Sequence, residues 1–163
     1  MQGEIHVWMP MIGFDRDAPD KGVGALLQEM SFTPTGISAF LFHPDIVHHH
    51  DGMDREKTLP PDNCSYYGSP RNEVRCRQDW TNYDLRILVG NLQAAGVAPY
   101  LGIMGSYLND HWHREWLSDH PEVKFAAREF EWSVNVLKRL ADGTYYEDFF
   151  VDRLCAALTD YGF

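Results

Sequence analysis

The chain has 163 residues, a formal net charge of -10, a pI near 5.1 and 44% hydrophobic residues. This much apolar material supports one buried core of ordinary size, so we expect a single domain over residues 1–163 and exclude a disordered tail. The acidic balance disfavours nucleic acid as a partner, because phosphate binding depends on clustered Lys and Arg. Apolar stretches such as residues 97–104 are far shorter than the ~20 residues that cross a bilayer, so no membrane partner is expected.

The first four residues lead directly into an apolar run, without a basic segment or a cleavage site of small residues. We therefore predict no secretory signal and expect a cytoplasmic protein. Cys64, Cys76 and Cys155 do not make a disulfide framework. They are expected to be free thiols, although Cys64 and Cys76 could pair in an oxidising compartment.

Three short apolar runs predict β-strands over residues 5–9, 37–42 and 97–104. The second and third runs are apolar on both faces, which is typical of parallel strands covered by helices. Amphipathic segments with helical spacing lie between them. The chain order is therefore strand, helix, strand, helix, strand.

The first two predicted helices have clear start and stop signals. The first follows Asp20, a candidate N-cap, and its apolar stripe is Val23, Leu26, Leu27 and Met30. The second starts after Thr81 or Asn82 and ends at Gly96, where a left-handed residue is expected. Its apolar stripe is Leu85, Leu88, Val89 and Leu92.

The third predicted helix starts at Thr144 and Glu147, which fit a capping box and make Glu147 a capping residue, and it ends at Gly162. A fourth strand should follow, but the sequence ends at Phe163. Serial β/α units form a parallel sheet that is completed either as a doubly wound layer or as an eight-fold barrel of ~250 residues. We expect an α/β fold that is a partial (β/α)8 barrel, the N-terminal part of a larger protein, with about three parallel β/α units.

Long connections follow the second and third strands, over about residues 43–80 and 105–143. The helix-to-strand connections are short. Long ordered loops are usually functional, and sites in β/α folds lie at the carboxyl ends of the strands. Binding residues are therefore expected in these connections.

Trp8, near the end of the first strand, can either stack on the flat face of a sugar ring or fill the barrel interior. His43 and Asp45 begin the second connection and are candidates for hydrogen bonding to a ligand. Residues 48–51, three histidines and an aspartate, have the chemistry of a divalent metal site, but no helical i, i+4 spacing supports one. The third interpretation of this connection is a solvated polar loop. We predict neither a metal nor a cofactor.

The third connection holds the most concentrated polar and aromatic segment, over residues 102–116. Its candidates for substrate binding can fix hydroxyl groups or offer a stacking surface: Asn109, Asp110, His111, Tyr107 and Trp112. His111 and His113 resemble the HxH metal pair of amidohydrolase barrels, but that pair belongs on the first strand. Trp116 is expected to pack the loop against the protein.

Several segments together carry a family resemblance: the Trp of the first strand, the His/Asp-rich second loop, DWTNYD at 79–84, AAGV at 94–97, YLG at 100–102, and the helix from DGTYY to DYGF. This order resembles the N-terminal part of a TIM-barrel glycoside hydrolase. The resemblance implies a small carbohydrate or oligosaccharide ligand. It also implies that the catalytic carboxylates follow strands four and seven, beyond this chain, so no catalytic residue is assigned and the chain alone is expected to be inactive.

Two other classes stay open. A metal-dependent barrel hydrolase or isomerase would use His43, His111 or His113 as ligands. A noncatalytic carbohydrate-binding or assembly domain would close its open sheet edges by self-association.

Overall fold

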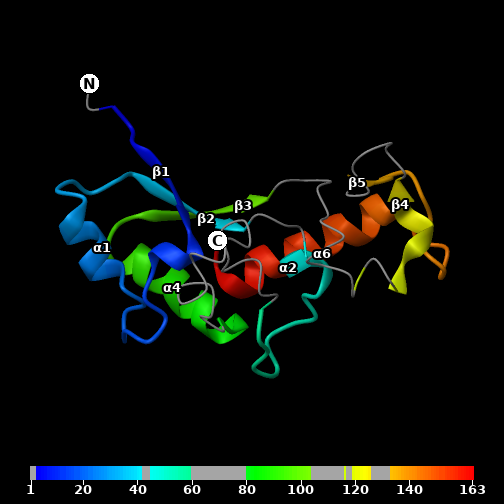
Figure 1. Ribbon diagram of the computed structural model, residues 1–163, viewed down its shortest axis with the longest axis horizontal. Coiled ribbons are helices and arrows are strands. Elements are labelled where there is room, and N and C mark those ends of the chain that lie inside the picture. Colours follow the sequence, from blue (N-terminus) through cyan, green and yellow to red (C-terminus); the bar gives the residue numbers. More distant parts are fainter. Residues whose placement is uncertain (1–2, 42–44, 60–79, 104–115, 117–118, 126–132) are drawn as a thin grey trace, which may run out of the picture.

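The computed structural model describes residues 3–41, 45–59, 80–103, 116, 119–125 and 133–163. It has a mixed α/β fold with a small open sheet of three parallel strands (Figure 1). Its elements in chain order are β1 (His6–Pro10), η1 (Met11–Gly13), α1 (Val23–Glu29), β2 (Gly36–Leu41), α2 (Asp45–His48), α4 (Asn82–Ala94), β3 (Ala98–Ile103), η4 (Pro121–Val123), β4 (Lys124–Phe125), β5 (Ser133–Val134) and α6 (Tyr146–Tyr161). None of the described helices is long and apolar enough to cross a membrane.

The three predicted strands are confirmed as β1, β2 and β3, which pair in sequential order and in parallel. The register places Trp8 opposite Ser38, and Ser38 opposite Tyr100. Because side chains alternate between the two faces of a strand, these three residues lie in one row on the same face of the sheet. The three carboxyl ends lie along a common edge.

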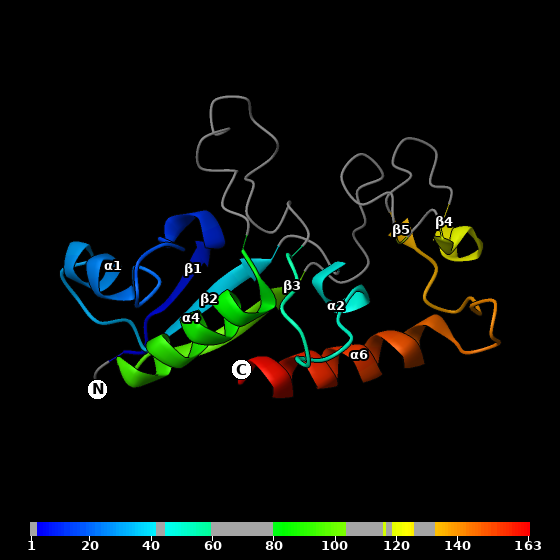
Figure 2. The same cartoon turned by 90° about the horizontal axis from the view of Figure 1, so that it is seen from below.

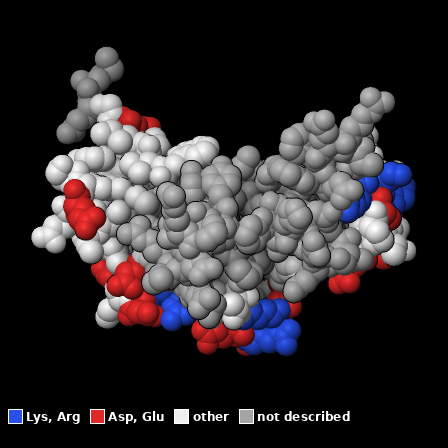
Figure 3. Space-filling view, viewed as in Figure 1, with Lys and Arg blue, Asp and Glu red and all other residues white. Residues whose placement is uncertain are grey.

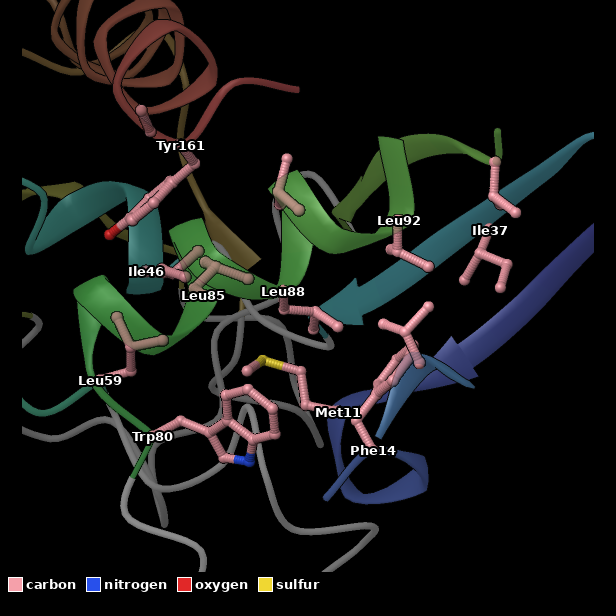
Figure 4. Packing of buried hydrophobic residues seen from close by; sticks show 14 of the residues in the cluster. Met11, Phe14, Ile37, Ile46, Leu59, Trp80, Leu85, Leu88, Leu92 and Tyr161 are labelled. Carbon is pink, nitrogen blue, oxygen red and sulfur yellow. The ribbon is translucent and has the colours of Figure 1, made fainter. Parts of the chain in front are cut away.

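Helices cover one face of this sheet, as Figures 1 and 2 show for α1 and α4. The buried residues beneath the sheet form one apolar cluster, here the sheet cluster (Figure 4): Met11, Phe14, Val23, Ile37, Ile46, Val47, Leu59, Trp80, Leu85, Leu88, Val89, Leu92, Val97, Ala157 and Tyr161. Val7, Met9 and Leu101 pack against it from the strands. Trp8 lies between Val7 and Met9, and Tyr100 directly precedes Leu101. Because side chains alternate along a strand, Trp8 and Tyr100 therefore belong to the opposite face.

Several of the predicted helix ends are confirmed. Thr81 is the N-cap of α4, and it forms a full capping box with Asp84. Gly96 and Gly162 have φ values of 76° and 85°, the left-handed conformation that the sequence predicted after the second and third helices. Only glycine adopts this conformation at little cost, so these two residues stop their helices where the apolar stripes end.

The prediction that Asp20 is an N-cap is wrong in position. The N-cap of α1 is Gly22, and both Lys21 and Gly22 have positive φ values, which inserts a left-handed turn between Asp20 and the helix. The Asp20 carboxylate still accepts hydrogen bonds from the backbone N–H groups of Gly22 at 3.0 Å and Gly24 at 2.8 Å. Asp20 therefore accepts from backbone N–H groups at the start of α1, although it lies two residues before the N-cap.

The capping box predicted from Thr144 and Glu147 is also wrong. The N-cap of α6 is Tyr145, whose side chain makes no capping hydrogen bond. The first helical N–H, that of Tyr146, instead donates to the carbonyl of Lys138 at 2.9 Å. A backbone carbonyl therefore replaces the side-chain cap that α4 has, and the local sequence does not show this.

A second cluster lies at the far end of α6, beyond the carboxyl edge of the sheet. Its buried members are Trp116, Val123, Val134, Leu140 and Tyr146, with Phe149 and Phe150 packed against them. We call it the Trp116 cluster. The short antiparallel pair β4–β5 and the turn of η4 belong to the same region, above the right-hand end of α6 in Figure 2.

Candidate functional site

The structure describes two of the eight predicted substrate-binding residues. Trp8 is the third residue of β1, and Asp45 is the first residue of α2, four positions beyond the end of β2. The other six lie outside the described residues: His43, Tyr107, Asn109, Asp110, His111 and Trp112. His113, Cys64 and Cys76 also lie outside them, whereas Cys155 is an exposed free thiol on α6.

Trp8 stands on the face of the sheet that α1 and α4 do not cover. Its side chain is 70% exposed, the most exposed large ring in the described part of the chain. In the same row, Ser38 is half-buried and Tyr100 is 45% exposed. An exposed indole next to a hydroxyl and a phenol combines a stacking surface with hydrogen-bonding groups, which is the composition of small-ligand sites.

A second aromatic pair crosses this face. The rings of His6 on β1 and Tyr100 on β3 have centroids 5.4 Å apart and are tilted by 60°. They meet above Gly36 of β2, where an added Cβ would lie 2.5 Å from Tyr100 Cε2 and 2.9 Å from His6 Nδ1. The glycine is thus required for contact between two strands that are not neighbours.

The sequence interpretation gave no role to His6 or Tyr100. The signal that could have found them is the two-residue alternation: His6 and Trp8 share a face of β1, and Tyr100 shares that face once the register is known. The register depends on pairing across the sheet, which the sequence did not provide.

Basic side chains are scarce near this face. Figure 3 shows Lys and Arg along the lower rim and at the right-hand end, whereas the described surface at the upper left is mainly uncharged, with some acidic atoms. Glu4 lies 3.6 Å from His6 Nε2. The row of Trp8, Ser38 and Tyr100 itself holds no charged side chain.

The two buried histidines of the second connection contact side chains of α6. His48 Nε2 lies 2.8 Å from the Tyr146 hydroxyl, and His50 Nε2 lies 2.8 Å from Asp160 Oδ2. His48 and His50 are buried, while His49 between them is exposed. Among the described residues, no group of three His, Cys, Asp or Glu side chains could hold an ion. These two histidines attach the second connection to α6.

Trp116 packs its loop against the protein, as predicted. Its indole is buried and stacks on the His48 ring at 4.1 Å with an interplanar angle of 12°. His120 lies against the same indole at 4.4 Å. Trp116 is therefore part of the protein interior and not a ligand surface.

The perturbed ionisable groups serve the scaffold. Burial raises the pKa of Asp84, but hydrogen bonds from Lys21 and from the Thr81 backbone outweigh it and hold that pKa below its usual range. A hydrogen bond from Lys57 lowers the pKa of Asp51. Burial raises the pKa of Tyr161 above its usual range. None of these groups lies in the row of Trp8.

No family model, curated protein or solved structure matches this chain. Its function must therefore be inferred from the fold and from the residues themselves.

Proposed function

We propose that this chain is the substrate-binding N-terminal part of a carbohydrate-active hydrolase with a glycosidase-like (β/α)8 barrel. Sequential parallel strands with helices on one face, as found for β1, β2 and β3, support a barrel. One half of a doubly wound sheet has the same strand order, so the order alone does not distinguish the two folds.

The contact between His6 and Tyr100 favours the barrel. Inside such barrels, inward side chains from alternate strands stack in common layers. His6 of β1 and Tyr100 of β3 come from alternate strands and touch above a glycine of β2. Under this proposal the face of the sheet opposite α1 and α4 is the inner face of the barrel.

Exposed Trp8 is the single observation that carries the carbohydrate proposal. It lies on that inner face, one row closer to the carboxyl edge than His6. A sugar presents C–H groups on a flat ring face, which suits an indole, and its neutral hydroxyls suit a row whose side chains, Trp8, Ser38 and Tyr100, are uncharged. The catalytic carboxylates of this proposal lie outside these 163 residues, so the chain alone binds sugar without hydrolysing it.

Saturation-transfer NMR with methyl glycosides and disaccharides tests this proposal. We expect signal transfer to the sugar ring protons, and Trp8→Ala should weaken binding by roughly 3- to 10-fold, the worth of one aromatic stacking contact. The matched control is Leu137→Ala, because Leu137 is also 70% exposed but lies on the loop after β5. Equal effects of the two substitutions, or no binding of any sugar, would contradict the proposal.

A noncatalytic carbohydrate-binding domain that self-associates is the second candidate, since both outer strands have an open edge in the described part of the sheet. Each outer strand contains a proline, Pro10 in β1 and Pro99 in β3, and proline has no N–H to donate to a pairing strand. Light scattering that finds a dimer with sugar binding and no turnover would favour this candidate.

A further inference from the structure

Tyr100 is the second exposed ring in the row of Trp8. The register places Trp8 on one side of Ser38 and Tyr100 on the other. Tyr100 is 45% exposed, and Ser38 between the two rings is half-buried. Neighbouring strands lie about 4.8 Å apart, so the backbones of Trp8 and Tyr100 are about 10 Å apart across β2.

The ring of Tyr100 lies over the neighbouring strand. Its Cε2 would be 2.5 Å from a Cβ at Gly36, which places the ring above β2, two residues before Ser38. The His6 ring meets it there, with centroids 5.4 Å apart. A ring contact of this kind restricts the rotamers of both side chains, so Tyr100 is ordered before a ligand arrives.

The row is wider than one stacking contact. Two stacked rings have centroids only about 4.5–7 Å apart, so a single sugar on Trp8 covers part of the row and leaves the Tyr100 ring exposed. A second sugar, joined to the first by a glycosidic bond, extends from Trp8 toward Tyr100. The Ser38 hydroxyl between them can donate to or accept from a sugar hydroxyl.

We propose that Tyr100 is a second sugar-binding ring, so that the row takes two adjacent sugars of an oligosaccharide, and that His6 is a positioning residue that orders Tyr100. This inference rests on the proposed function, because it extends the sugar site of Trp8. A side chain that becomes ordered only on binding costs affinity, so a ring that is ordered beforehand contributes more. The row therefore favours a disaccharide over a single sugar.

The ratio of two dissociation constants tests this proposal. The ligands are matched pairs, such as methyl β-glucoside with cellobiose and methyl β-mannoside with mannobiose, titrated into the full chain by NMR. We call the dissociation constant of the single sugar divided by that of the disaccharide the disaccharide gain. Tyr100→Ala should lower the disaccharide gain by roughly 3- to 10-fold, the worth of one stacking contact. A variant that is only less stable loses affinity for both ligands alike, which leaves the disaccharide gain unchanged.

Tyr145→Ala is the matched control. Tyr145 is 39% exposed and its ring also has a partner, since Arg139 lies over it at 3.9 Å, but it is the N-cap of α6 and lies outside the sheet. This substitution should leave the disaccharide gain within about twofold. Tyr100→Phe keeps the ring and its contact with His6 but removes the hydroxyl. It should retain the disaccharide gain to within about threefold.

A double-mutant cycle tests the role of His6. His6→Ala removes the ring that meets Tyr100 and should lower the disaccharide gain by roughly 2- to 5-fold. In the Tyr100→Ala background it should change the disaccharide gain by less than about twofold, because a positioning residue acts only through the ring that it positions. His6→Phe keeps a ring for this contact but removes the imidazole that Glu4 approaches, and it should recover most of the disaccharide gain.

The outcomes separate this inference from the proposed function. If Trp8→Ala weakens sugar binding but Tyr100→Ala leaves the disaccharide gain unchanged, the proposed function stands and the second ring is wrong. An unsubstituted chain that binds both ligands of every pair equally tightly also overturns the second ring. Equal effects of His6→Ala in both backgrounds overturn the positioning role. If the unsubstituted chain binds no sugar, the proposed function and this inference are both wrong.

Discussion

The sheet cluster and the Trp116 cluster are assembled from different kinds of segments. The sheet cluster draws on strands and helices whose apolar residues repeat with regular spacing, such as the stripe of α4. The Trp116 cluster gathers single residues from η4, β5, α6 and the turns between them, and is bordered by His48 from a distant connection. Regular elements supply many contacts for each ordered residue, whereas isolated residues rely on a few specific ring contacts.

This difference indicates that the two clusters are not equally robust. A cluster built on helices and paired strands is expected to open only when the whole sheet unfolds. A cluster held by stacked rings and one buried histidine, His48, depends on each contact, so it is expected to open locally before the sheet cluster does. The following substitutions test that comparison.

The largest effect is expected in the sheet cluster. Leu88→Ala removes a side chain that is fully buried and should lower the free energy of unfolding by about 3 kcal/mol. Val123→Ala, the equally buried counterpart in the Trp116 cluster, should cost roughly 2 kcal/mol and mainly affect that region. Urea unfolding followed by far-UV and near-UV circular dichroism checks this. Coincident far-UV and near-UV curves in the Val123 variant would show that the two clusters unfold together and would contradict the expected difference.

A smaller loss is expected where His6 and Tyr100 meet. Gly36→Ala puts a Cβ 2.5 Å from Tyr100 and 3.0 Å from the Ala98 carbonyl, which should cost roughly 1–3 kcal/mol. Gly90→Ala on α4 is the control, because its added Cβ meets nothing within 4 Å and should stabilise the helix by up to about 1 kcal/mol. Thermal unfolding of both variants decides whether the ring contact across β2 restricts the sheet.

The ion pair between Lys21, in the turn before α1, and Asp84, in the first turn of α4, should make stability depend on acidic pH. Lys21 Nζ lies 2.6 Å from Asp84 Oδ1, and the pKa of Asp84 is lowered. A depressed folded-state pKa means that the pair stabilises above the unfolded value of about 3.9 and that this contribution, roughly 1–2 kcal/mol, is lost as pH falls through the folded-state pKa. Asp84→Asn and Lys21→Met should both flatten this loss in unfolding curves between about pH 5 and pH 2, and an unchanged slope in both would refute the assignment.

The smallest difference concerns the two threonines that the sequence placed at helix starts. Thr81→Ala should lower the free energy of unfolding by about 1 kcal/mol, because Thr81 accepts a hydrogen bond from the Asp84 N–H at 3.1 Å. Thr144→Ala should change it by less than about 0.5 kcal/mol, since Thr144 caps no helix. Chemical denaturation of the two variants measures both losses. A larger loss for Thr144→Ala than for Thr81→Ala would contradict the observed caps.

Much of the sheet region could be predicted because its signals are local. Apolar runs marked the three strands, helical spacing marked α4, and Thr81 with Gly96 marked its two ends. The candidate site was less accessible to prediction. The sequence predicted that the Trp8 ring either stacks on a sugar or fills the barrel interior. Its neighbours in the row, Ser38 and Tyr100, could be identified only from the strand register.

The histidine-rich segment shows why local chemistry misleads. The sequence of residues 48–51 allowed a metal site, a ligand-binding loop or a solvated loop. The structure gives each buried histidine a different partner on α6, Tyr146 for His48 and Asp160 for His50. Those partners are about a hundred residues away in sequence, so no spacing within the loop could have indicated them.

The sequence by itself determined the order of strands and helices, their apolar faces and the glycines that end α4 and α6, because each depends on contacts within a few residues along the chain. Only the tertiary structure decided which face of the sheet α1 and α4 cover, that His6 meets Tyr100 over Gly36, and that His48 stacks on Trp116. These features require segments far apart in the sequence to approach one another, and that approach is set by how the buried side chains pack together.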